Sequence, residues 1–97
     1  MKVYTFSIGI LPIWNIKEMK KIAEVLKSLD GFIGVHNLHD FENKRHATIL
    51  IFDSYNNAIG GRNTFKFYGN DVGEYILDGE LSDDKQTLTI GKPVERS

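Results

Sequence analysis

The sequence predicts an α+β fold in which two helices cover one face of an antiparallel sheet. Several segments alternate apolar and polar residues, as half-buried strands do, and one long segment spaces its apolar residues three and four apart, as an amphipathic helix does. Turn-forming residues join the later alternating segments into hairpins. With 97 residues, of which 41% are hydrophobic, the chain suits a single domain (1–97) around one core.

The first strand and the first helix have the clearest patterns. The strand is predicted at Lys2–Ile10 and the helix at Ile16–Leu29. Asn15 is suited to cap the start of the helix, and Gly31 is suited to the left-handed conformation that ends one. We expect the helix to pack on the strand face that carries Tyr4, Phe6, Ile8 and Ile10.

A hairpin is predicted within Gly34–Asp53, with Asn43-Lys44 as a two-residue turn that places His39 opposite Thr48. One face then carries Leu38, Ala47, Ile49 and Ile51, with His36 at its margin. We expect the other face to be open and to share its side of the sheet with Val3 and Thr5. Because a slip of one residue would exchange the faces, the assignment depends on the turn. The residues predicted on this open face are Asn37, His39, Phe41, His46, Thr48, Leu50 and Phe52.

A second helix is predicted between Asp53 and Gly69, with Asp53 or Ser54 as its cap. Within it, Gly60-Gly61 favours close approach of the helix to the sheet, although Phe65 and Phe67 alternate as in a short strand. A last hairpin is predicted at Asp71–Ile90 with its turn at Ser82–Lys85, followed by a frayed tail at Lys92–Ser97.

The resulting order is β-α-β-β-α-β-β, which resembles the ferredoxin-like β-α-β-β-α-β fold with an extra C-terminal strand. The resemblance lies in the order of elements over nearly the whole chain. It implies an antiparallel sheet with both helices on one face, and it implies no function, because unrelated activities share this fold.

Charge is unevenly distributed along the chain. Residues 1–52 carry seven Lys and Arg against five Asp and Glu, whereas residues 53–97 carry five against eight. The pI of about 6.3 makes nucleic acid an unexpected partner, since proteins that bind phosphate backbones usually show a basic patch or a pI above about 9. Six acids fall between positions 70 and 84 with no base among them: Asp71, Glu74, Asp78, Glu80, Asp83 and Asp84.

These acids are the first candidate site. Glu74, Asp78 and Glu80 are predicted to project from one face of a strand, with Asp83 and Asp84 at its turn. Such a row would present negative charge to a basic, nucleic-acid-binding groove of a protein partner. The competing interpretation is a solvated edge that is kept charged to prevent pairing with other chains.

Other features narrow the functional class. The chain has no cysteine, so disulfides, thiolate metal sites and a cysteine nucleophile are excluded, and a reducing cytoplasm suits the composition. No run of residues is long and apolar enough to cross a membrane. His39 and His46 supply two imidazoles on one face, fewer ligands than a zinc site needs, so we expect no metal and no cofactor.

We therefore expect a non-enzymatic protein-binding module. In size and in its acidic hairpin the chain is similar in general style to small phage or mobile-element inhibitors of host defence, including anti-CRISPR proteins. An alternative is a domain that binds a small ligand or nucleic acid on the open face, as a homodimer, through His39, Phe41, His46 and Phe52. A less favoured alternative is an enzyme with His39 or His46 as general base.

Overall fold

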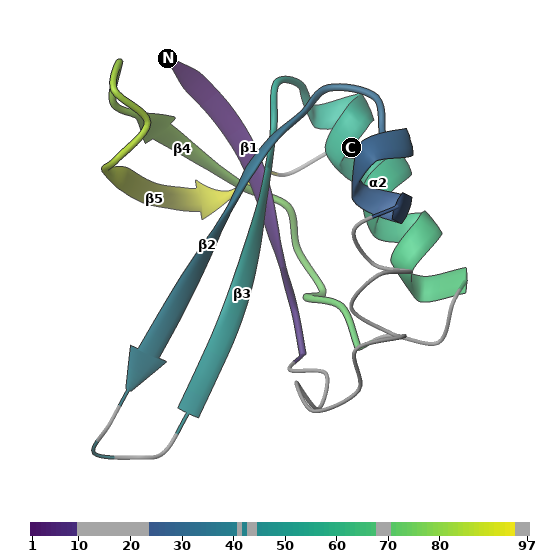
Figure 1. Cartoon of the computed structure of the whole chain (residues 1–97), viewed down its shortest axis with the longest axis horizontal. Coiled ribbons are helices and arrows are strands. Elements are labelled where there is room, and N and C mark those ends of the chain that lie inside the picture. The colour runs from purple at the N-terminus through teal and green to yellow at the C-terminus, as the bar shows by residue number, and fades with distance from the viewer. Residues whose placement is uncertain (10–23, 41, 43–44, 68–70, 95–97) are drawn as a thin grey trace.

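The chain folds as an α+β structure, shown in Figure 1 as a computed structural model that describes residues 1–9, 24–40, 42, 45–67 and 71–94. Residues 24–28 form a helical segment that precedes the second strand. The other elements are β1 (Lys2–Ile8), β2 (Phe32–Asp40), β3 (Arg45–Phe52), α2 (Tyr55–Phe67), β4 (Leu77–Leu81) and β5 (Leu88–Pro93).

The strands form one five-stranded sheet in the order β2-β3-β1-β4-β5, with every neighbouring pair antiparallel. This confirms the predicted α+β class and the antiparallel sheet. β1 lies at the centre because Val3, Thr5, Phe6 and Ile8 are all buried, and only a strand with neighbours on both sides and cover on both faces buries so much of its length.

Local signals fix the ends of the helices. The N–H of Asn57 donates to Ser54 Oγ at 3.2 Å, so Ser54 is the N-cap of α2. Asp53 instead accepts a bond from the Asn57 side-chain amide at 2.8 Å. Gly31 has φ 71°, which confirms its predicted left-handed conformation after the first helical segment. Asn15 and residues 16–23 of the predicted helix lie outside the described residues.

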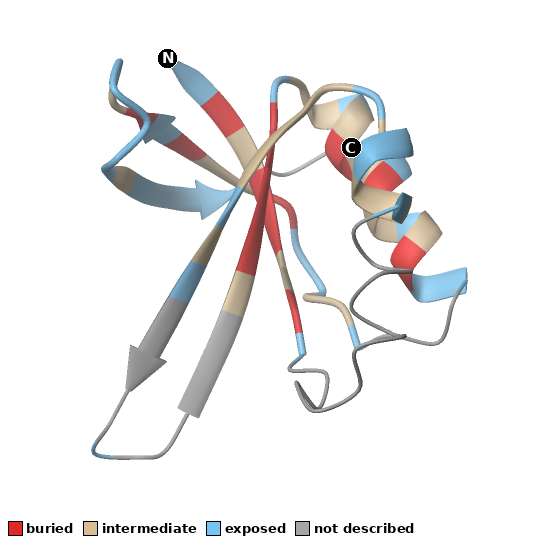
Figure 2. Cartoon of the chain, in the orientation of Figure 1, coloured by how far each residue is buried: buried red, intermediate tan, exposed pale blue. Residues whose placement is uncertain are grey.

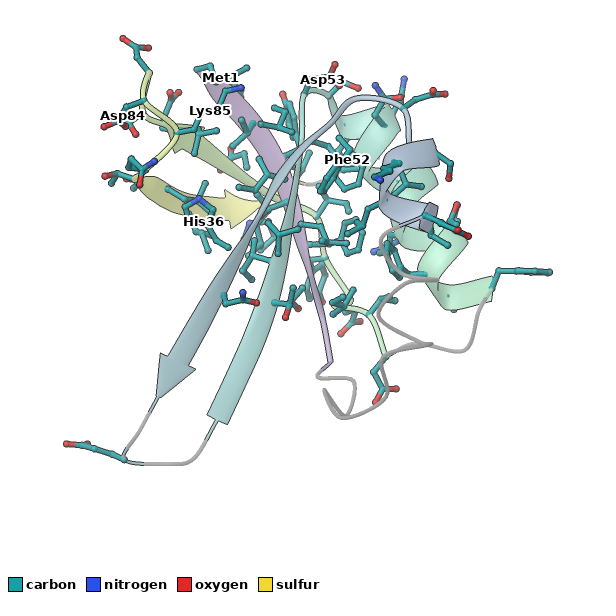
Figure 3. The ribbon with its side chains drawn as sticks, viewed as in Figure 1. Met1, His36, Phe52, Asp53, Asp84 and Lys85 are labelled. Atoms are coloured by element: carbon teal, nitrogen blue, oxygen red, sulfur yellow. The ribbon has the colours of Figure 1, made fainter. Side chains whose placement is uncertain are left out.

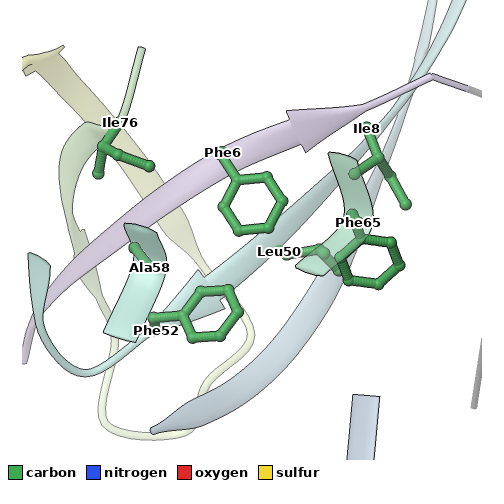
Figure 4. Close-up of a cluster of buried hydrophobic side chains, with 7 residues drawn as sticks. All are labelled: Phe6, Ile8, Leu50, Phe52, Ala58, Phe65 and Ile76. Carbon is green, nitrogen blue, oxygen red and sulfur yellow. The ribbon is translucent and has the colours of Figure 1, made fainter. Parts of the chain in front are cut away.

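The main core lies between the sheet and the helices (Figure 4). Phe6 of β1 stacks on Phe52 of β3 with ring centroids 5.5 Å apart, and its ring also lies 6.3 Å from that of Phe65 on α2. Val25, Leu26 and Leu29 pack against the same cluster as α2, so both helical segments cover one face of the sheet. The buried members are Phe6, Ile8, Leu50, Phe52, Ala58, Phe65 and Ile76. Burying each large side chain contributes about 1.5–3 kcal/mol.

The predicted open face of β3 is wrong, because Leu50 and Phe52 lie beneath the helices. Phe52 is opposite Tyr4 and Leu50 is opposite Phe6, so these residues share the face of β1 that the helices cover. Residues directly opposite in an antiparallel pair project to the same side of the sheet. The sequence pattern of β3 offers an apolar set on each face, and its pairing with β1 decides which set goes inward.

The opposite face of the sheet carries a second, smaller core. Val3, Ile51 and Leu81 are buried there, and Ile33 of β2 and Leu88 of β5 pack against them. β2 and β5 are the two edges of the sheet, so both edge strands add an apolar side chain to this cluster. Thr5 is buried on this face and its hydroxyl donates to the carbonyl of Leu77 at 3.2 Å. Figure 2 shows buried residues in each of β1, β3 and β4.

The β2–β3 register differs from the prediction by two residues. His39 is opposite His46, not Thr48, and Asp40 is opposite Arg45. The predicted turn at Asn43-Lys44 lies outside the described residues. A shift of two residues leaves the grouping of residues into two faces unchanged. The side chains of His39 and His46 lie outside the described part of the structure.

β5 continues to Pro93, so the prediction of a frayed tail is wrong for Lys92 and Pro93. A register shift between the Leu77 and Gly79 pairs accommodates this end of the strand, and the N–H of Val94 donates to the carbonyl of Ile76 at 2.8 Å. Residues 95–97 lie outside the described residues.

Candidate functional site

The six acids extend along β1 from one end to the other. At one end the N–H of Gly9 donates to the carbonyl of Asp71 at 2.8 Å, and at the other the N–H of Leu81 donates to the carbonyl of Met1 at 2.9 Å. Figure 3 shows Met1 at the same end of the molecule as the turn residues Asp84 and Lys85, away from Phe52. The acids are thus spread along the sheet and do not converge on a point.

Glu74 does not belong to the predicted strand row. β4 begins at Leu77, and Asp78 and Glu80 are the two acids that share one of its faces. Val72 is paired with Ile8 of β1, and Leu77 is paired with Thr5. The chain advances by five residues from Val72 to Leu77, whereas β1 advances by only three residues between the two partners. The two additional residues cannot stay paired with β1, so the segment bends outward and carries Glu74 with it.

This bend exposes an aromatic side chain, that of Tyr75. Tyr75 is 57% exposed, whereas its neighbour Ile76 is buried in the main core. The guanidinium of Arg62 on α2 holds the bend by donating to the carbonyl of Glu74 at 2.6 Å. No sequence signal marks Tyr75, because simple alternation with Leu77 and Leu81 hides the bend.

Asp78 is occupied by a structural contact. Its Oδ1 accepts a hydrogen bond from the N–H of Lys92 at 2.9 Å, and the same atom lies where a Cβ at Gly91 would be. The carboxylate therefore satisfies a backbone donor at the point where the β4–β5 register shifts. Gly91 leaves the space for it.

We expect Asp78→Ala to destabilise the protein by about 1 kcal/mol, because the Lys92 N–H loses the hydrogen bond to the Asp78 carboxylate. Asp78→Asn retains a side-chain oxygen and should preserve most of the stability. Urea unfolding midpoints of the two variants measure the difference, with Glu74→Ala as an exposed control. Equal losses in the Asn and Ala variants would show that charge, and not the hydrogen bond, is what matters.

Asp84 is likewise part of the fold. Its Oδ1 accepts bonds from the Ser82 hydroxyl at 2.6 Å and from the N–H of Gln86 at 3.0 Å, and these bonds lower the pKa of the Asp84 carboxyl. The N–H of Thr87 donates to Ser82 Oγ at 2.9 Å, and Lys85 takes φ 60°. The predicted turn at Ser82–Lys85 is confirmed, and Asp84 is its organising acceptor.

The remaining four acids, Asp71, Glu74, Glu80 and Asp83, are exposed, and together with Tyr75 we call them the acidic surface. Within the described part of the chain the one ion pair joins Glu80 to the Met1 amine at 3.6 Å, a solvent-exposed contact that adds little to stability. The carboxylates of the other three make no hydrogen bond or ion pair with a described residue. Three carboxylates of the acidic surface, those of Asp71, Glu74 and Asp83, thus carry charge that no described residue neutralises.

The alternative ligand face does not come together as predicted. Phe52 is fully buried against α2, so it cannot stack on a ligand. His39 and His46 are opposite one another in the β2–β3 register, and Phe41 lies outside the described residues. Across the described ranges, no group of three or more His, Asp or Glu is arranged to hold a metal ion.

Gly60-Gly61 has a packing role. A Cβ at Gly61 would lie 2.5 Å from Cζ of Phe52, whereas nothing lies within 4 Å of one at Gly60. Gly61 therefore lets α2 approach the sheet, as the sequence predicted, and the Gly-Gly-Arg-Asn segment lies inside a helix and not in a phosphate-binding loop.

No helix in the described ranges has the length and apolar character to span a membrane. Comparison of the chain with models of protein families, with curated protein sequences and with solved structures found no match.

Proposed function

We propose that this protein is a non-enzymatic binding module whose acidic surface docks on a basic, nucleic-acid-binding groove of a protein partner. The observation that carries the proposal is the set of exposed carboxylates at Asp71, Glu74 and Asp83, which no described basic group neutralises. Charge of one sign attracts a partner of the opposite sign and raises the rate of encounter.

Tyr75 supplies an apolar anchor within this surface. It is 57% exposed and follows Glu74 directly, so a partner that neutralises the carboxylate also reaches the ring. Interfaces draw most of their affinity from a few residues, and tyrosine is prominent among them. The combination of an aromatic ring with flanking acids suits a groove lined with Lys and Arg, because Arg also stacks on aromatic faces.

The proposal extends to the biological setting. A small acidic module that occupies a nucleic-acid-binding groove would act as a competitive inhibitor, in the manner of phage or mobile-element inhibitors of a cytoplasmic host defence complex, including anti-CRISPR proteins.

A ferredoxin-like architecture is part of the same proposal. Its support is the order β2-β3-β1-β4, in which β3 lies between β1 and β2, and β1 lies between β3 and β4.

Charge reversal at the acidic surface tests the proposal. The test is a triple variant, Glu74→Lys with Glu80→Lys and Asp83→Lys. Its affinity for the partner should fall by at least about tenfold for each of these residues that contacts the partner. Asp78 and Asp84 are left intact because they support the fold. The matched control reverses three exposed acids elsewhere, Glu24, Asp30 and Glu42, and gives the same net charge.

The first measurement is an affinity pulldown from lysate at low and moderate salt. The second is a competition assay, in which this chain and nucleic acid compete for binding to the captured protein. Wild type and the control triple should retain the partner and displace its nucleic acid, and the acidic-surface triple should do neither. Exposed charge contacts are screened over about 10 Å at 0.1 M salt, so retention should fall as salt rises. Equal behaviour of the two triple variants would refute the proposal.

A further inference from the structure

The two edges of the sheet differ in how they are protected. An edge strand presents unpaired N–H and C=O groups, which proteins usually blunt with bulges, lysine or proline. β5 has these devices: its pairing with β4 shifts between Leu77 and Gly79, and the strand ends in Lys92-Pro93. Proline has no N–H to donate, so this end of β5 cannot form a regular ladder with another strand.

β2, at the other edge, has no such protection along most of its length. Its register irregularity lies at its start, between Phe32 and Gly34, and pairing with β3 is regular from there to Asp40. The run Phe32–His39 contains no Lys, Arg, Asp, Glu or Pro. None of the residues that the structure describes pairs with the outer side of β2.

The far half of β2 belongs to a projecting arm. β1 pairs with β3 only between Thr48 and Phe52, so Leu38–Asp40 and Arg45–Ala47 extend past β1 as a two-stranded ribbon (Figure 1). A two-stranded hairpin is at best marginally stable by itself, and a third strand alongside it adds a hydrogen-bonded ladder. Val35, at the base of the arm, is 37% exposed.

We propose that β2 is a self-association edge, at which two copies of this chain pair their β2 strands antiparallel about a two-fold axis. A two-fold pairing uses the same strand of both copies, so neither β2 edge remains free and the assembly stops at a dimer. The uncharged run brings no like charges together, and the formal net charge of −1 opposes association little. The protected β5 edges at both ends of the joined sheet prevent further growth.

This pairing leaves the acidic surface free. Four of its five residues lie along the segment from Asp71 to Glu80, which is separated from β2 by β1 and β3 in the sheet. The dimer therefore presents one acidic surface at each end. The inference is independent of what the acidic surface binds.

The test is the mass of the purified full chain in solution, by sedimentation equilibrium at protein concentrations up to about 1 mM. Wild type should reach twice the 11.1 kDa mass of one chain. Val35→Lys places a charge at the pairing edge and should weaken association at least tenfold, while Thr89→Lys, an exposed position on β5, should leave it unchanged.

Circular dichroism of each variant establishes that the monomer is folded, so a change in mass reports association alone. The proposal is overturned by a single-chain mass for wild type at every concentration. It is also overturned if Val35→Lys associates as tightly as wild type, or if Thr89→Lys disrupts the dimer equally.

Discussion

Phe52→Ala is expected to remove about 3–5 kcal/mol of stability, the largest effect of any substitution considered for this protein. Phe52 is fully buried, and its ring lies 5.5 Å from that of Phe6 and 5.8 Å from that of Phe32. A domain of this size has roughly 5–15 kcal/mol in total, so the variant should lose a large part of its stability. Urea unfolding followed by far-ultraviolet circular dichroism measures the loss.

Phe67→Ala is the matched control, because it removes the same ring from a position that is 85% exposed. Its effect should stay within about 0.5 kcal/mol. The pair also discriminates between the two views of β3. If Phe52 stood on an open ligand-binding face, its replacement would leave stability nearly unchanged, and a wild-type unfolding curve for Phe52→Ala would overturn the core described above.

The adjacent glycines of α2 should respond to alanine with opposite signs. At Gly61 the new Cβ would lie 2.5 Å from Cζ of Phe52, so the ring or the helix must shift. We expect Gly61→Ala to destabilise by about 1–2 kcal/mol, since overpacking outweighs the gain in helix propensity. At Gly60 nothing lies within 4 Å, and Gly60→Ala should stabilise by about 1 kcal/mol.

Thermal or urea unfolding of the two variants side by side measures this difference. A double variant adds a second check: Phe52→Leu shortens the side chain that the new methyl group meets, so Gly61→Ala should cost less in that background than in wild type. If both alanines stabilise the protein equally, the helix is not held against Phe52 as closely as described.

Local features of the fold were predictable from the sequence. The alternation at Lys2–Ile8 defines a strand and identifies Phe6 as core, because side chains on a strand repeat every two residues. Ser54 and Gly31 mark helix ends through hydrogen bonding and backbone conformation that depend on neighbouring residues alone. The turn at Ser82–Lys85 belongs to the same class.

The candidate site was predictable only in part. The sequence identifies all six acids, yet it does not separate Asp78 and Asp84, whose carboxylates are used by the fold, from those that remain free. It also does not identify Tyr75 as an exposed side chain. These differences arise from the bend before β4 and from the register shift between β4 and β5. Both depend on how many residues each of two neighbouring strands has between the same paired positions.

The sequence alone was enough to predict which residues of a strand alternate, where the helical segment before Gly31 ends and where α2 begins, because these features follow from interactions within a few residues. The tertiary structure alone decided that Leu50 and Phe52 lie beneath α2, that His39 is opposite His46, and which edge of the sheet is left unprotected. Both faces of β3 are apolar enough to be buried, so its own pattern does not choose between them. Its pairing with β1, more than forty positions away in the chain, makes that choice.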